Sequence, residues 1–128
     1  MKGQSVRASC HCRAVQLMVQ LDQGLEKLRR CNCSICSRHG AIVASVLLPK
    51  LHIIKGQECL REYRFNTGQA VHYFCSICGI YTHHHRRSTP TEYSLNIACL
   101  DGIKIEDFYK TDIPILNGRD QHPSDQSA

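Results

Sequence analysis

The sequence has no tryptophan, and aromatic residues make up 6% of its 128 residues. Proteins that bind single-stranded nucleic acid interleave aromatic stacking platforms with a basic stripe, whereas the basic residues here are scattered along the chain. We therefore do not expect nucleic-acid binding, although the net charge is +5. The same mild positive charge suits a small anionic substrate.

The sequence also lacks an apolar run of membrane-spanning length and the charged, hydrophobic and small-residue order of a signal peptide. We expect a cytoplasmic protein without membrane contact. With 42% hydrophobic residues the chain can bury one modest core, which predicts a single domain over residues 1–116. Residues 117–128 lack the apolar side chains that would offset the entropy of ordering, so we expect a flexible polar tail there.

Short runs rich in Val, Ile, Tyr and Phe alternate with Gly, Pro, Asn or Asp along the chain. In the run from Ala14 to Leu21, every second residue is a large aliphatic one, which is typical of a half-buried strand. This pattern predicts a mainly β fold of small antiparallel sheets. A helix of one or two turns is expected only near Ser34 to His39.

Nine cysteines are the most unusual feature of the composition. Thiol buffers keep disulfides open in a reducing compartment, so clustered cysteines there more often bind metal, and their odd number agrees with this interpretation. Seven of them form three clusters, which are Cys10 with Cys12, Cys31 with Cys33 and Cys36, and Cys75 with Cys78. Gly79 follows the last pair and can adopt the positive φ that a tight C-x-x-C turn needs.

Two thiolates from Cys10 and Cys12 and two from Cys75 and Cys78 complete a closed tetrahedral zinc site, which is typical of structural zinc. Cys31, Cys33 and Cys36 then remain as a group of three, and three protein ligands leave a position for water or substrate, as in catalytic zinc sites. Two alternatives stay open: these three cysteines hold metal only weakly, or a fourth ligand closes a second structural site. The residues considered for that ligand are Cys59, Cys99, His39, His83, His84 and His85.

The order C-x-C, C-x-C-x-x-C and F-C-x-x-C-G over residues 9–102 resembles the glutathione-dependent formaldehyde-activating (GFA) family, also called the CENP-V/GFA domain. The resemblance implies the Mss4-like fold, in which small sheets are held by zinc, and a carbon–sulfur lyase activity on glutathione–aldehyde adducts of the S-hydroxymethylglutathione type. It also implies two Zn²⁺ ions per chain. Position by position, it assigns the structural zinc to Cys10, Cys12, Cys75 and Cys78, and the catalytic zinc to Cys31, Cys33 and Cys36.

A small thiol such as glutathione and an aldehyde are the partners that this chemistry implies. Three thiolates on one zinc ion and an incoming substrate thiolate accumulate negative charge, and the cations beside the cluster can offset it. The substrate-binding residues expected on this ground are Arg30, Arg38 and His39, with Arg29 as a further flanking cation. Replacing Arg38 with alanine is then expected to raise the Michaelis constant for the thiol.

The stretch from Tyr81 to Ser88 carries three consecutive histidines. On a strand His84 projects to one side and His83 and His85 to the other, so the three side chains do not converge on one ion. Either His84 or the other two can serve as proton donor to a developing alkoxide. The competing hypothesis for the whole chain is a non-enzymatic module with two structural zinc sites that recognises a protein or nucleic acid. The number of protein ligands at the metal of Cys31, Cys33 and Cys36 separates the two hypotheses.

Overall fold

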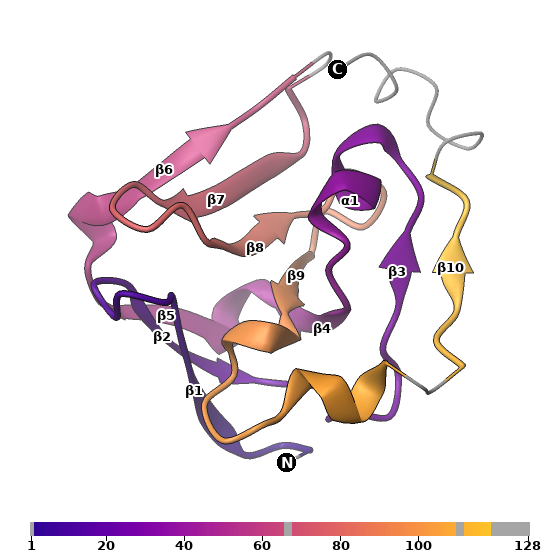
Figure 1. Ribbon diagram of the computed structural model, residues 1–128, viewed down its shortest axis with the longest axis horizontal. Helices are drawn as coiled ribbons and strands as arrows, with labels where there is room; N and C mark the ends of the chain where they lie inside the picture. Colours follow the sequence, from indigo (N-terminus) through magenta and orange to yellow (C-terminus); the bar gives the residue numbers. More distant parts are fainter. Residues whose placement is uncertain (1, 66–67, 110–111, 119–128) are drawn as a thin grey trace.

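The computed structural model describes residues 2–65, 68–109 and 112–118. A three-stranded antiparallel sheet has the order β1 (Ser5–Ser9), β2 (Gln16–Gln20), β5 (Leu51–Lys55). A five-stranded antiparallel sheet has the order β4 (Val43–Leu47), β9 (Glu92–Asn96), β8 (Tyr81–His85), β7 (Val71–Cys75), β6 (Leu60–Tyr63). In Figure 1 these sheets lie to the left of the short helix α1 (Ser34–His39) and of a small strand pair.

That strand pair consists of β3 (Arg30–Cys31) and β10 (Ile115–Leu116), which run parallel. Single turns of 3-10 helix connect the strands elsewhere, at Leu48–Lys50, Gln57–Cys59, Ile97–Cys99 and Ile105–Phe108. The fold is mainly β with small antiparallel sheets, as predicted, and it fits the Mss4-like arrangement. No helix of the described ranges is long and apolar enough to cross a membrane.

The aliphatic face of the first predicted strand forms part of the core. Val15, Leu17, Val19 and Leu21 are each at most 1% exposed, and they pack in one buried cluster with residues of the larger sheet such as Leu95. Burying a side chain of this kind contributes roughly 1.5–3 kcal/mol. The alternation that predicted this strand therefore also identifies the residues that join the two sheets.

The predicted helix is confirmed over Ser34–His39. The Cys33 side chain accepts a hydrogen bond from the backbone N–H of Cys36 as the N-cap, and Gly40 ends the helix with φ of +64°. This helix is too short to be stable alone, so its caps and its packing hold it. Its first turn positions two of the clustered cysteines.

Two parts of the fold differ from the sequence-based expectation. The sequence pattern indicated no strand before Ala14, but Ser5–Ser9 pairs with β2 along its whole length. The β3–β10 pair is parallel, whereas only antiparallel sheets were predicted. Of the predicted tail, Asn117 and Gly118 lie within the structure and residues 119–128 lie outside the described residues.

A row of polar side chains crosses one face of the five-stranded sheet. The strand register aligns Tyr63 with His72, His72 with His84, His84 with Ser94, and Ser94 with Ser45. Since neighbouring residues of a strand face opposite sides, His83 projects to the other face, where it is 2% exposed. Three residues of this row, His72, His84 and Ser94, line the cavity of the candidate site.

Candidate metal centre and adjoining pocket

The four cysteines Cys10, Cys12, Cys75 and Cys78, which we term the four-cysteine cluster, bring their sulfurs within 4.8 Å of one another. The Cys12 sulfur lies 3.7 Å from the Cys10 sulfur and 3.7 Å from the Cys75 sulfur. Zn–S bonds of about 2.3 Å in a tetrahedron place sulfurs about 3.8 Å apart, whereas a disulfide needs about 2.05 Å. The spacing and the all-sulfur donor set fit a zinc ion.

Local backbone geometry prepares this cluster. The Cys75–Cys78 turn is closed by a hydrogen bond of 2.8 Å from the N–H of Gly79 to the carbonyl of Cys75, and Gly79 has φ of +79° as its C-x-x-C position requires. Backbone N–H groups also donate to the sulfurs, from Val15 to Cys10 at 3.3 Å and from Ile77 to Cys75 at 3.4 Å. Such donors stabilise thiolates, and the cluster links the end of β1 to the end of β7.

Cys31, Cys33 and Cys36 form a separate three-cysteine cluster, and their sulfurs also lie within 4.8 Å of one another. Cys31 ends β3, Cys33 caps α1, and Cys36 lies within that helix. Among the described residues, no other His, Cys, Asp or Glu offers a ligand atom within this distance of all three sulfurs. None of the candidates for a closing ligand therefore reaches this cluster.

The three thiols form hydrogen bonds with one another, and these shift their pKa values in opposite directions. Hydrogen bonds from Cys33 and Cys36 lower the pKa of Cys31, while hydrogen bonding to Cys31 and Cys33, together with burial, raises the pKa of Cys36. Three thiolates in so small a volume repel one another, so all three ionise only when a cation balances them. The donor set thus fits a soft divalent metal such as zinc.

Gly118 packs directly against the three-cysteine cluster. A Cβ atom placed on Gly118 would lie 2.6 Å from the Cys31 sulfur and 3.2 Å from the Cys33 Cβ. The Gly118 N–H also donates to the Cys31 sulfur and lowers the pKa of that thiol. The C-terminal end of the described chain is therefore part of the cluster's surroundings.

A Gly118→Ala variant is expected to bind zinc at the three-cysteine cluster roughly 10- to 100-fold more weakly, as loss of an outer contact to a metal ligand typically does. The methyl group forces the Cys31 sulfur out of place, while the four-cysteine cluster is untouched. Competition with a chromogenic chelator measures this affinity. Asn117→Ala is the matched control, at an exposed neighbouring residue whose side chain accepts a hydrogen bond of 3.2 Å from Asn32. If both variants bound zinc with the native affinity, the contact of Gly118 with the three-cysteine cluster would play no part in holding the metal.

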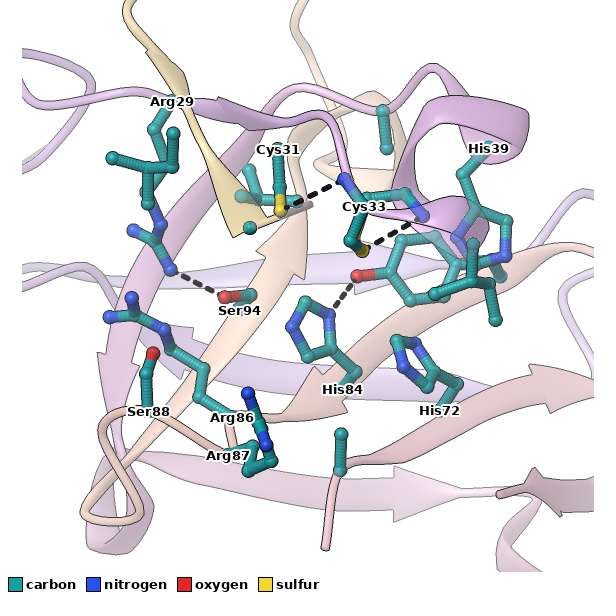
Figure 2. Close-up of a pocket in the computed structure, with 18 of the residues that line it drawn as sticks. Arg29, Cys31, Cys33, His39, His72, His84, Arg86, Arg87, Ser88 and Ser94 are labelled. Atoms are coloured by element: carbon teal, nitrogen blue, oxygen red, sulfur yellow. Dashed lines mark hydrogen bonds between the residues drawn. The ribbon is translucent and has the colours of Figure 1, made fainter. Parts of the chain in front are cut away.

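The three cysteines line one end of a cavity of about 200 Å³. Figure 2 shows Cys31 and Cys33 at its top, with His84 below them and His39 and His72 on one side. The four-cysteine cluster contributes none of its residues to this lining. Only the three-cysteine cluster adjoins this cavity, so a molecule bound in the cavity can contact that cluster and not the four-cysteine cluster.

The buried Tyr81 and the half-buried His84 form a hydrogen-bonded pair beside the cysteines. The Tyr81 hydroxyl lies 2.6 Å from Nδ1 of His84, and both residues line the cavity. The His39 ring stacks on Tyr81 at 4.1 Å between centroids, and the His72 ring stacks on His84 at 4.6 Å. Burial raises the pKa of Tyr81 and lowers the pKa of His84, so both are uncharged at neutral pH.

His72 lines the cavity and has a buried polar atom. Its Nδ1 has no hydrogen-bond partner among the described residues. Burial lowers the pKa of His72 to about 4, so its ring is neutral at neutral pH. A buried polar atom without a partner costs about 1–3 kcal/mol.

The three residues expected to bind substrate do not all line the same cavity. His39 lines the cavity of the three-cysteine cluster, whereas Arg38 and Arg30 are not among its lining residues. The Arg38 guanidinium donates to the carbonyl of Ser34 at 2.8 Å and lines a neighbouring cavity. The Nε atom of Arg30 is buried, with no hydrogen-bond partner among the described residues.

The consecutive histidines separate as the strand pattern predicted. His84 lines the cavity, while the buried His83 stacks on Tyr73 at 4.6 Å and bonds to the Thr82 hydroxyl at 2.9 Å. His85 bonds to the carbonyl of Pro90 at 2.6 Å. Sequence reasoning missed Tyr81, His72, Arg86 and Arg87 at this site. Alternation along β8 could have paired His84 with Arg86, but nothing in the sequence marks the others.

Comparison with known proteins adds two findings. A family model described as glutathione-dependent formaldehyde-activating enzyme matches residues 5–115. The crystal structure of a Rhodobacter sphaeroides protein is 46% identical in sequence and superposes with a TM-score of 0.81. This match covers 85% of the present chain and 98% of the other.

Proposed function

This chain belongs to the glutathione-dependent formaldehyde-activating enzyme family, and from that membership we propose that it is a zinc-dependent carbon–sulfur lyase. Its substrates are glutathione–aldehyde adducts of the S-hydroxymethylglutathione type. Cys10, Cys12, Cys75 and Cys78 hold a structural zinc ion, and Cys31, Cys33 and Cys36 hold a catalytic one. The family match supports a function of the glutathione-dependent formaldehyde-activating type, and the zinc chemistry and substrate are our proposal.

One observation carries this proposal. Three sulfurs without a fourth protein ligand among the described residues adjoin a cavity lined by a tyrosine, histidines and arginines. A closed structural site has four protein ligands and needs no adjoining cavity. This arrangement favours the enzyme over the non-enzymatic module with two structural sites.

The reaction joins a thiol sulfur to an aldehyde carbon. The S–C bond forms, the C=O bond becomes a C–OH single bond, and the proton that leaves the thiol balances the proton gained by the oxygen. A zinc ion at the three-cysteine cluster supplies a Lewis acid and a position at which a substrate thiol ionises near neutral pH. The chain itself must then stabilise the negative charge that develops on the aldehyde oxygen.

Tyr81 is the residue that we assign to this oxygen. With its Nδ1 protonated, neutral His84 donates to the Tyr81 oxygen and leaves the hydroxyl hydrogen directed to the substrate. The ring of His39 stacked on Tyr81 fixes the position of the phenol. A hydrogen-bond donor fixed in a site that excludes water needs little reorganisation during the reaction, which is why such donors accelerate it.

A Tyr81→Phe variant is expected to lower turnover by roughly 100-fold, the effect typical of removing a positioned donor or acid. The Michaelis constant and the zinc content should stay close to native, because phenylalanine keeps the stacking with His39. Exchange spectroscopy of glutathione and formaldehyde measures the rate.

Tyr73→Phe provides the matched control, since Tyr73 stacks on His83 and does not line the cavity. It should retain native turnover. If Tyr81→Phe also turned over at the native rate, Tyr81 would have no part in the chemistry.

The function itself is tested by the rate at which formaldehyde exchanges between free and glutathione-bound forms. Glutathione and formaldehyde combine without help, so the relevant quantity is the excess over the rate in buffer. The zinc-loaded protein should raise this rate in proportion to its concentration. A rate equal to that in buffer would favour the non-enzymatic module.

A further inference from the structure

A second cavity adjoins that of the three-cysteine cluster. Its volume is about 590 Å³, against about 200 Å³ for the first. Small-molecule sites typically measure roughly 300–1,000 Å³, so the second cavity has the size of such a site. The two cavities share the lining residues Ile35, His39, Ala41, His72 and Tyr81. We term the second one the aromatic cavity.

Rings and aliphatic side chains predominate in the lining of the aromatic cavity. Besides the shared residues, they include Tyr63, Tyr73, Phe74, Ile80 and Tyr109. No Asp, Glu, Lys or Cys is among the described residues that line it. Removing apolar surface from water is favourable, so this lining suits an apolar group. An apolar cavity of about 150 Å³ already accommodates benzene, and an aryl group therefore fits within the volume.

Two polar side chains other than the rings line the aromatic cavity, and both have partners. Asn96 donates to the carbonyl of Tyr81 at 2.9 Å and accepts from the N–H of Ala98 at 3.2 Å. The Arg38 guanidinium donates to the carbonyl of Ser34 at 2.8 Å. Asn96 is half-buried and Arg38 is exposed, so neither needs a ligand to complete its contacts. The apolar surface is therefore what selects a ligand here.

A ligand in the aromatic cavity would cover apolar side chains that the fold leaves exposed. Tyr63, Ile80 and Tyr109 are 45%, 36% and 64% exposed. They belong to β6, the turn before β8 and the segment after the last 3-10 turn, and all three line this cavity. Exposed apolar residues are ordinary when scattered, whereas a group of them around a hollow marks an interaction site.

Tyr81 connects the aromatic cavity to the proposed chemistry. Its hydroxyl, which we assign to the aldehyde oxygen, lies 2.6 Å from Nδ1 of His84, a residue of the first cavity. Figure 2 shows His39 and His72, which line both cavities, together on one side of the first. An aldehyde oxygen at Tyr81 places the aldehyde carbon beside the residues that the cavities share. Formaldehyde has no carbon substituent there, but a larger aldehyde does.

We infer that the aromatic cavity binds the apolar substituent of the aldehyde, so that the substrates of this chain include adducts of arylalkyl aldehydes. This inference rests on the proposed function for the roles of zinc and the thiol. The reaction is unchanged: the S–C bond forms, the C=O bond becomes a C–OH single bond, and the thiol proton balances the one gained by the oxygen. The substituent takes no part in these steps, and its burial raises the affinity for the aldehyde. The charged ends of a glutathione-type thiol suit an apolar lining less well.

The first measurement compares 3-phenylpropanal with propanal as partners of glutathione. Both aldehydes have a methylene group beside the carbonyl, so their reactivity in buffer is similar. Exchange spectroscopy on the zinc-loaded protein gives the excess rate over buffer as a function of aldehyde concentration. The Michaelis constant of 3-phenylpropanal should be roughly 10- to 100-fold lower. Equal constants for the two aldehydes overturn the inference.

A second comparison moves the phenyl group to the thiol. With formaldehyde as the aldehyde, 3-phenylpropane-1-thiol should have no advantage over propane-1-thiol. An advantage on the thiol and none on the aldehyde overturns the assignment, because the cavity would then hold the other reactant.

Variants of the aromatic cavity locate the effect. Ala98 is exposed and lines this cavity but not the first, so Ala98→Trp should occupy part of its volume. The Michaelis constant of 3-phenylpropanal should rise about 10-fold or more, while formaldehyde exchange stays native. Tyr109→Ser, which removes one ring of the lining, should raise the same constant and keeps the test available if Ala98→Trp does not fold.

Ile54→Ser is the matched control for Tyr109→Ser. Ile54 is 46% exposed on β5 and is not among the lining residues of either cavity. Its variant should keep the native advantage of 3-phenylpropanal. The inference is overturned if folded Ala98→Trp and Tyr109→Ser both keep that advantage, or if Ile54→Ser loses it equally.

Binding without chemistry separates this inference from the proposed function. Calorimetry compares 3-phenylpropan-1-ol with propan-1-ol, neither of which has a carbonyl group, and the phenyl compound should bind at least about 10-fold more tightly. If it does and no aldehyde exchange is accelerated, the apolar site stands and the lyase activity does not. If formaldehyde exchange is accelerated but the phenyl compound does not bind more tightly, the lyase activity stands and the inference does not. Contact with another protein or a second copy would then be what covers the exposed side chains.

Discussion

A Cys75→Ser variant is expected to lose one zinc ion per chain and to lose cooperative unfolding. The Cys75 side chain is fully buried, and its sulfur lies 3.7 Å from that of Cys12 at the place where the two sheets meet. Structural zinc contributes about 10–16 kcal/mol in zinc-finger peptides, whereas the net stability of a domain is about 5–15 kcal/mol. Loss of zinc at this one site can therefore cost more free energy than the net stability of the domain.

Calorimetric unfolding and metal analysis measure the two consequences together. Cys59→Ser is the matched control, because Cys59 is a half-buried cysteine outside both clusters and its variant should retain two zinc ions. Chelation of zinc from the native protein should produce the same unfolded state, and added zinc should restore the fold. A Cys75→Ser variant that unfolds cooperatively near the native temperature would show that the four-cysteine cluster does not hold the sheets together.

A Cys33→Ser variant, unlike Cys75→Ser, is expected to keep its fold. Its rate of formaldehyde exchange with glutathione should fall to the rate in buffer. Cys33 caps α1, its sulfur accepting from the Cys36 N–H at 3.5 Å, and serine is among the best residues at an N-cap. The helix should therefore survive the substitution. The three-cysteine cluster loses one of its three sulfurs, and two thiolates are too few to retain zinc.

The measurements for this variant are far-UV circular dichroism, zinc content and exchange spectroscopy. One zinc ion per chain should remain, and the unfolding temperature should stay within a few degrees of native, a shift that corresponds to about 1 kcal/mol. Cys59→Ser again provides the control for replacing a cysteine with serine. Native exchange in Cys33→Ser would exclude the three-cysteine cluster from the reaction, and loss of both zinc ions would show that the clusters are not independent.

Spacing along the sequence was enough to separate the cysteines into two groups. A pair two residues apart and a C-x-x-C turn are local features, so the division into four and three did not require the tertiary structure. The same holds for the helix from Ser34 to His39, whose limits are set by Cys33 and Gly40. Alternation placed the aliphatic residues of β2 in the core for the same reason.

The sequence alone could not decide which arginines line the cavity, because their positions depend on the tertiary structure. Arg38 is two residues from Cys36, yet it bonds back to the carbonyl of Ser34 within the helix. Arg29 reaches the cavity because the register of β4 with β9 aligns Ser45 and Ser94, the two residues to which it donates. Of the cations that flank the cysteines in sequence, Arg29 and His39 therefore line this cavity, while Arg38 lines the neighbouring one.

Two strand regions were missed for a different physical reason. β1 has the sequence SVRAS, whose polar residues do not give the alternation typical of a strand. It forms a strand because it pairs with the edge of β2. β3 and β10 have two residues each, too few for any periodicity. Tyr81 was missed because the sequence does not show that its hydroxyl bonds to His84, three residues away, beside the cavity.

The most direct test of a closed and an open zinc site in one chain is a crystal structure of the zinc-loaded protein with diffraction measured at the zinc absorption edge. Two anomalous peaks per chain are predicted. One peak should lie about 2.3 Å from four sulfurs, those of Cys10, Cys12, Cys75 and Cys78. The other should lie at that distance from the sulfurs of Cys31, Cys33 and Cys36, with a solvent or substrate atom as its fourth ligand. A fourth ligand from any side chain at the second peak, or a single peak per chain, would contradict the open site.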